Sequence, residues 1–83
     1  MKKYLSITNA EYINDYKIKL IFNDNTTNLI NFENFILNSH HNDIKKYQDK
    51  NLFKNFNLKN GDLQWNDYDL AFPIYDLYKG HIS

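Results

Sequence analysis

The chain has 83 residues, no cysteine, and ten lysines that balance ten acidic residues, so its formal net charge is zero. This length fits one small domain over residues 1–83, and the lack of cysteine excludes disulfide bonds and thiolate metal sites. Arginine is also absent, which argues against direct reading of DNA bases, because the arginine guanidinium is the commonest side chain for that contact.

The first part of the chain alternates apolar and polar residues, as half-buried strands do. This pattern runs through residues 4–12, 17–22 and 26–32. Residues that favour tight turns separate the three runs, at Asn14-Asp15 and at residues 23–25. The sequence therefore predicts an antiparallel meander of three strands.

The middle of the chain predicts helical structure. Residues 35–37 form a short apolar run that suits one helical turn under the sheet. We expect a central helix to begin at Asn42 or Asp43, whose side chain would accept hydrogen bonds from the free backbone N–H groups. Apolar residues then change face, so the helix is expected to break near residues 49–51 and to resume at Leu52.

The last third predicts a hairpin followed by a short helix. Asn60-Gly61 is the strongest hairpin signal in the chain, and alternating residues on both sides place the hairpin at 56–65. Pro73 suits the first turn of a helix, and Gly80 can close its C-terminus. The predicted fold is α+β: an antiparallel sheet, made of the N-terminal three-strand meander plus a hairpin, with one central helix and a short C-terminal helical turn.

Residues 65–78 form the most distinctive tract of the chain, and a weaker tract includes residues 16–20, Phe22 and Phe32. These two tracts resemble domain-of-unknown-function family 2442. The resemblance implies a small bacterial α+β domain, sometimes joined to a DNA-binding helix-turn-helix and often encoded beside a small partner in toxin–antitoxin arrangements. It supplies no catalytic residues. Because the chain ends at Ser83, we expect no attached helix-turn-helix here.

Three carboxylates near the end of the chain suggest a possible metal or acid–base site. Asp67 and Asp69 are two residues apart and would share one face of a strand, with Asp76 shortly after them. Paired carboxylates can bind Mg²⁺ or share a proton. We prefer the alternative that Asp67 and Asp69 bond to turn backbone and that Asp76 lies near a helix start.

Histidines give a second metal hypothesis, at His40, His41 and Asp43. Adjacent histidines seldom face the same centre, His81 lies near the chain end, and a structural zinc site needs four well-spaced ligands. We therefore prefer a solvated loop, and predict neither a metal site nor a cofactor.

Lysines offer a nucleic-acid hypothesis. Lys46, Lys50 and Lys54 would form a stripe on a straight helix, with Lys45 beside it, and could contact phosphates without reading bases. The expected helix break spoils this geometry. We prefer a solvated helix face and keep nucleic-acid binding as a weak alternative.

Catalysis has little support in the sequence. No serine or threonine lies in a nucleophile motif with a histidine and a carboxylate, and the two glycines are too far apart for a phosphate-binding loop. Lys2 and Lys3 resemble the basic start of a signal peptide, but no apolar run follows them. No stretch of the sequence approaches the length of a membrane-spanning helix, which needs about 20 apolar residues. We expect a soluble, cytoplasmic, non-enzymatic protein without a membrane partner.

Aromatic residues are the remaining signal, at 17% of the chain. Trp65 and Phe72 are expected in the core, whereas Tyr68 and Tyr75 suit a surface that faces a partner, because tyrosine is enriched among interface anchors. The residues predicted for protein binding are Tyr68, Tyr75, Tyr78, Asp67, Asp69 and Asp76.

The leading functional hypothesis is a protein-binding module that masks a small toxin or enzyme, as an antitoxin does. One alternative is an inhibitor from a phage or mobile element that blocks a bacterial nuclease such as a CRISPR effector. In that case Asp62, Asp67, Asp69 and Asp76 would imitate phosphates in a basic channel. Exposed strand edges also leave pairing of two copies open.

Overall fold

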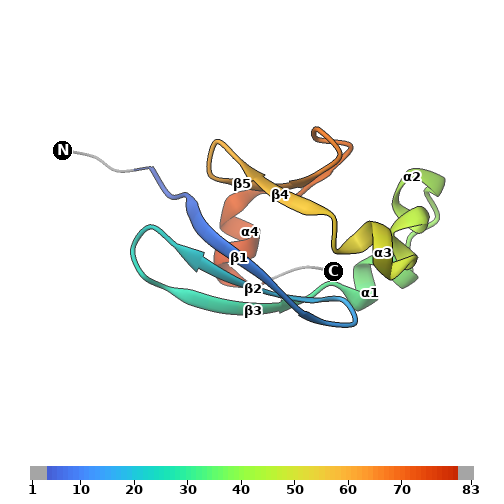
Figure 1. Ribbon diagram of the computed structural model, residues 1–83, viewed down its shortest axis with the longest axis horizontal. Helices are drawn as coiled ribbons and strands as arrows, with labels where there is room; N and C mark the ends of the chain where they lie inside the picture. Colours follow the sequence, from blue (N-terminus) through green and yellow to red (C-terminus); the bar gives the residue numbers. More distant parts are fainter. Residues whose placement is uncertain (1–3, 81–83) are drawn as a thin grey trace.

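The structure is a computed structural model, and it describes residues 4–80. In these residues the chain forms two three-stranded antiparallel sheets connected by short helices (Figure 1). The elements are β1 (Ile7–Asn14), β2 (Lys17–Phe22), β3 (Thr27–Asn31), α1 (Glu33–Leu37), α2 (Asn42–Lys45), the 3₁₀ helix η1 (Lys46–Gln48), α3 (Lys50–Phe53), β4 (Phe56–Lys59), β5 (Asp62–Trp65), β6 (Leu70–Ala71) and α4 (Ile74–Lys79). The predicted α+β class is confirmed.

The first sheet is the predicted meander, in the order β1-β2-β3. Its central strand, β2, buries every second side chain completely, at Ile18, Leu20 and Phe22. The two tight turns contain Asp15 and Asn25 with positive φ angles of 47° and 70°. Asp and Asn tolerate this left-handed backbone better than most residues, which is why these turns could be predicted.

The central helical region is divided into three short segments. The predicted cap is wrong, because α2 begins after His41 without a side-chain cap, and Asn42 and Asp43 lie inside the helix. The break falls at Asp49, whose extended backbone (φ −71°, ψ 113°) ends η1. The Asp49 side chain then accepts a hydrogen bond from the Asn51 N–H at 2.9 Å and caps α3. Asp49 therefore separates η1 from α3, within the predicted break at residues 49–51.

The second sheet contains the predicted hairpin and a third strand that was not predicted. Asn60 and Gly61 both have positive φ, 55° and 81°, as the tight turn between β4 and β5 requires. Strand β6 pairs with β5 through Ala71 and Leu70, opposite Gln64 and Trp65. The C-terminal helix α4 begins directly after Pro73, which is its N-cap and not part of its first turn, and it ends at the left-handed Gly80 as expected.

Two sets of hydrogen bonds join the parts of the fold. The Ile7 N–H of β1 donates to the Gly61 carbonyl at 2.8 Å, which ties the first sheet to the tip of the β4–β5 hairpin. The Asn28 side chain of β3 donates to the Leu77 carbonyl at 3.1 Å and to the Tyr78 carbonyl. These carbonyls lie in the last turn of α4, where a helix leaves backbone carbonyls that its own N–H groups do not all satisfy.

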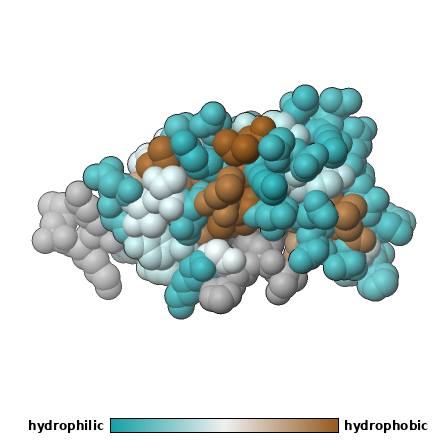
Figure 2. Space-filling view, turned by 90° about the horizontal axis from the view of Figure 1, so that it is seen from below, coloured by the Kyte–Doolittle hydropathy of each residue, from teal (hydrophilic) through white to brown (hydrophobic). Residues whose placement is uncertain are grey.

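Both sheets and the helices contribute to one core. Trp65 is fully buried at its centre, surrounded by the rings of Phe32, Tyr47, Phe53, Phe56 and Phe72. Phe72 is also buried, so the predicted core positions of Trp65 and Phe72 are confirmed. On the face seen from below, hydrophobic residues form several separate groups among hydrophilic ones (Figure 2).

Candidate functional site

The residues predicted for protein binding fall on two surfaces. Asp67, Tyr68 and Asp69 lie in the turn between β5 and β6, here called the β5–β6 loop (residues 66–69). The other three, Tyr75, Asp76 and Tyr78, lie on α4. Each surface also includes residues that were not predicted from the sequence.

The β5–β6 loop has an unusual backbone. Asn66, Asp67 and Tyr68 have consecutive positive φ angles of 51°, 56° and 68°. Asn and Asp tolerate this backbone, so the cost of about 1–2 kcal/mol falls mainly on Tyr68. This run reverses the chain between β5 and β6, so the expectation that Asp67 and Asp69 share one face of a strand is wrong. The surrounding structure must hold the loop in place.

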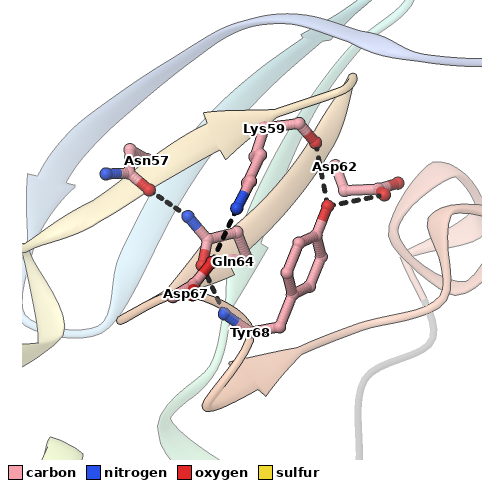
Figure 3. A network of polar contacts seen from close by, with 6 residues as sticks. All are labelled: Asn57, Lys59, Asp62, Gln64, Asp67 and Tyr68. Atoms are coloured by element: carbon pink, nitrogen blue, oxygen red, sulfur yellow. Dashed lines mark hydrogen bonds and ion pairs between the residues drawn. The ribbon is translucent and has the colours of Figure 1, made fainter.

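Gln64 of β5 supplies much of that support (Figure 3). Its side chain is only 3% exposed, and its Oε1 accepts a hydrogen bond from the Tyr68 N–H at 2.7 Å. Its Nε2 donates to the Asn57 Oδ1 on the neighbouring strand. A buried amide whose donor and acceptor are both used fixes the position of the loop relative to the hairpin.

The hydroxyl and the ring of Tyr68 both make contacts with neighbouring residues, but Tyr68 stays 43% exposed. Its hydroxyl donates to the Lys59 carbonyl at 3.2 Å and lies 3.4 Å from the Asp62 Oδ2 (Figure 3). The Lys59 Nζ lies 5.5 Å from the centroid of the Tyr68 ring and binds the Asp67 Oδ1 at 2.6 Å. The Lys59–Asp67 hydrogen bond raises the pKa of Lys59 and lowers the pKa of Asp67, so both stay charged at neutral pH.

Asp69 connects the loop to the helical region. Its Oδ2 lies 2.6 Å from the Lys46 Nζ and accepts a hydrogen bond from the Tyr47 hydroxyl at 3.0 Å. Hydrogen bonds from Lys46 and Tyr47 lower the pKa of Asp69. Burial, with the hydrogen bond to Asp69, raises the pKa of Tyr47 to about 12. Asp69 therefore anchors the loop to η1, whereas the contact of Gln64 with Asn57 anchors it to β4.

The Tyr47 hydroxyl should make stability depend on alkaline pH. Its pKa is raised from 10.0 to about 12 in the folded chain, so the unfolded chain loses this proton first. The contribution of this pKa shift to the free energy of unfolding is complete below pH 10 and is lost as pH rises toward 12. We expect Tyr47→Phe to cost about 1.5 kcal/mol at pH 7, through loss of a hydrogen bond to a charged acceptor.

Urea unfolding of both proteins at pH 9 and pH 11 measures this effect. The wild type should lose more stability over this interval than Tyr47→Phe, because the phenylalanine ring cannot titrate. The comparison cancels the effect on stability of the titration of the other tyrosines and the lysines, because both proteins contain them. Equal losses in the two proteins would contradict the assigned role of Tyr47.

The second surface is a groove of about 360 Å³ between α4, the β2–β3 turn and the segment that precedes β1. We call it the tyrosine groove, and its lining residues are Tyr4, Leu5, Asn23, Asp24, Tyr75 and Tyr78. Tyr4 is 85% and Tyr75 62% exposed. The Tyr78 hydroxyl donates to the Asp24 Oδ2 at 2.6 Å. Asp76 is exposed in the first turn of α4 and is not among the lining residues.

Sequence reasoning missed Tyr4, Asp24, Gln64 and Lys59. Tyr4 and Asp24 reach the groove only through the tertiary fold, since Asp24 and Tyr78 are 54 residues apart. Gln64 had a weak signal, because it lies in an alternating strand next to a predicted core tryptophan. Nothing in the local sequence shows that its amide would be buried.

The four lysines of the nucleic-acid hypothesis do not form a stripe. Lys46 pairs with Asp69, and Lys50 pairs with Asp15 at 3.0 Å. The Lys54 Nζ lies 5.9 Å from the Tyr12 ring, and Lys45 is exposed at the end of α2. Two of the four charges are thus already neutralised, because the broken helix points them toward carboxylates of other elements.

The histidines of the metal hypothesis are exposed at positions 40 and 41, and His81 lies outside the described residues. Within residues 4–80, no three histidine or acidic side chains are placed to hold a metal ion together. The helices of that same range are all too short and too polar to cross a bilayer.

Comparison with known protein families gives a match over nearly the whole chain. A family model described as "Protein of unknown function (DUF2442)" matches residues 7–83, which is nearly the whole chain and confirms the resemblance found in the sequence. Searches among curated proteins and among solved structures gave no match. The family description names no activity, substrate or partner.

Proposed function

We propose that this chain, which belongs to the DUF2442 family of proteins of unknown function, is a non-enzymatic module that binds a protein partner through the β5–β6 loop. The main support is the run of three left-handed residues that displays Tyr68 at the surface. Strained backbone of this kind tends to persist at functional sites. A loop already fixed by its own contacts also loses little conformational freedom when a partner binds.

Tyr68 has the properties of an interface anchor. Its ring offers a large apolar surface with only two side-chain torsions to restrict. The hydroxyl contacts to Lys59 and Asp62 already hold one orientation in the free chain. Such a preformed aromatic side chain can dominate the energy of an interface.

The charges near the loop favour an antitoxin-like role for this chain over imitation of nucleic acid. Asp67 and Asp69 would have to present their charge to a basic channel, but Lys59 and Lys46 already neutralise them at 2.6 Å each. We therefore place Tyr68 at the centre of the contact, with a small toxin or enzyme as the partner that is masked.

Co-expression with the products of neighbouring genes, followed by pull-down, tests this function. We expect one neighbour to copurify with the full-length chain. Tyr68→Ala should weaken that complex about 30-fold, as expected for an anchor worth about 2 kcal/mol. Isothermal titration of the purified partners measures the change.

The matched control is Leu29→Ala, which shortens another exposed apolar side chain, 59% accessible on β3. It should leave the affinity unchanged. Circular dichroism of each variant shows whether the fold is kept. Failure of every neighbour to copurify, or full affinity in a folded Tyr68→Ala variant, would overturn the proposed function.

A further inference from the structure

We propose that the tyrosine groove is a subsite for the side chain of a lysine or arginine presented by a protein partner. The groove shares no residue with the β5–β6 loop, so it would add a second, independent contact to the binding module. Its volume of about 360 Å³ suits one long side chain, at the lower end of the about 300–1,000 Å³ of small-molecule sites.

A negative charge is fixed in the groove. The Asp24 Oδ2 accepts a hydrogen bond from the Tyr78 hydroxyl at 2.6 Å, and its Oδ1 accepts one from the Thr26 N–H at 2.9 Å. The bond from Tyr78 is the largest cause that lowers the pKa of Asp24, so the carboxylate stays ionised. Within residues 4–80, lysines pair with Glu11, Asp15, Asp67 and Asp69 but not with Asp24.

Three tyrosines line the same groove as this charge. Tyr4, Tyr75 and Tyr78 line the groove, and the face of a tyrosine ring attracts cations. Asn23 fixes the wall that carries Tyr4, because its Nδ2 donates to the Tyr4 carbonyl at 2.7 Å and its Oδ1 accepts from the Ser6 N–H at 3.2 Å. A groove that combines one carboxylate with three tyrosines suits a cationic side chain.

A neutral occupant fits this arrangement poorly. It would cover the Asp24 carboxylate and remove water from it without supplying an opposite charge, which is costly. A lysine or arginine supplies that charge and lays its apolar stem along the rings. Charge complementarity therefore selects a basic residue of a partner as the occupant.

Nuclear magnetic resonance of the ¹⁵N-labelled full-length chain tests the site at low salt. The probe is Nα-acetyl-lysine amide, and its matched control is Nα-acetyl-norleucine amide, which has the same stem without the charge. We expect the lysine probe to shift the amide signals of Asp24, Tyr75 and Tyr78, and the norleucine probe to shift them far less.

Three variants test whether Asp24 and Tyr75 cause these shifts. Asp24→Asn keeps an oxygen that can accept from Thr26 but removes the charge, and should weaken the lysine probe about three- to fivefold. Asp43→Asn removes an equal, exposed charge from α2 and should change nothing. Tyr75→Ala, at an exposed position, should also weaken binding of the lysine probe. It tests the site if Asp24→Asn fails to fold.

Three results would overturn the site. These are equal binding of both probes, full binding of the lysine probe by folded Asp24→Asn or Tyr75→Ala, and no shifts at all. Shifts of the same amides with protein concentration alone would place a second copy in the groove and also exclude the proposed occupant. Tyr68→Ala should leave probe binding unchanged, so this site and the β5–β6 loop succeed or fail separately.

Discussion

We expect Trp65→Ala to lower the free energy of unfolding by about 3–5 kcal/mol, the largest effect of any single substitution considered for this chain. Trp65 is 0% exposed, and five other aromatic rings pack around it. Its indole N–H also donates to the Phe53 carbonyl at 2.6 Å. Removal of the ring leaves a cavity at the centre of the core and a buried carbonyl without its donor.

The loss is severe because the domain is small. A chain of 83 residues has a total stability of about 4–12 kcal/mol at the usual value per residue. We expect the melting temperature to fall by about 15–30 °C, as measured by circular dichroism. Trp65→Phe keeps most of the ring and should lose about 1–3 kcal/mol, mainly through the missing hydrogen bond.

Tyr75→Ala is the matched control, since it removes an aromatic ring that is 62% exposed. Its effect on stability should stay within about 0.5 kcal/mol. A loss below about 1 kcal/mol for Trp65→Ala would contradict the central place of this side chain, because cavity formation alone costs more.

Elements with a local cause could be predicted from the sequence. The period-two burial of Ile18, Leu20 and Phe22 follows directly from their alternation with polar residues. Asn60 and Gly61 adopt the positive φ angles for which they were selected. In each case one or two neighbouring residues determine the local backbone, so the wider fold is not needed to predict it.

Strand β6 could not be predicted because its cause is not local. It has only two residues, too few for a period to show. Its direction depends on the left-handed run through Tyr68, a conformation that a tyrosine rarely adopts and that the buried Gln64 supports. Short strands that depend on a tertiary hydrogen bond leave little signal in the chain itself.

The candidate site divides in the same way. Tyr68 and Tyr75 are exposed, as expected for a domain whose core is too small to bury all its aromatic residues. Their roles in binding stay predictions. Asp67 and Asp69 were selected as carboxylates, but their lysine partners come from β4 and η1 and are visible only in the fold. Asp24 enters the groove for the same reason, through its contact with Tyr78.

The junction between the two sheets should be nearly as sensitive as the core. A Cβ atom at Gly61 would lie 2.5 Å from the Ser6 Cβ, so β1 or the hairpin would have to move. The backbone there also has a φ of 81°, which disfavours any residue with a side chain. We expect Gly61→Ala to cost about 2–4 kcal/mol, from left-handed strain plus overpacking.

Gly80→Ala separates these two contributions. Gly80 has nearly the same φ, 77°, but a Cβ there would meet only the Ile30 Cδ1 at 3.9 Å. It should therefore cost only the strain of about 1–2 kcal/mol. Urea unfolding of both variants measures the difference, which should be at least about 1 kcal/mol and belongs to the contact with Ser6.

Ser6→Gly then tests whether that contact is the cause. It removes the Cβ that Gly61→Ala would meet, so the double variant should recover about 1–2 kcal/mol relative to the sum of the single ones. Recovery would show that the close approach of the Ser6 Cβ to the hairpin requires a glycine at position 61. Equal costs for Gly61→Ala and Gly80→Ala, or strict additivity with Ser6→Gly, would instead place the requirement for Gly61 in its backbone angle alone.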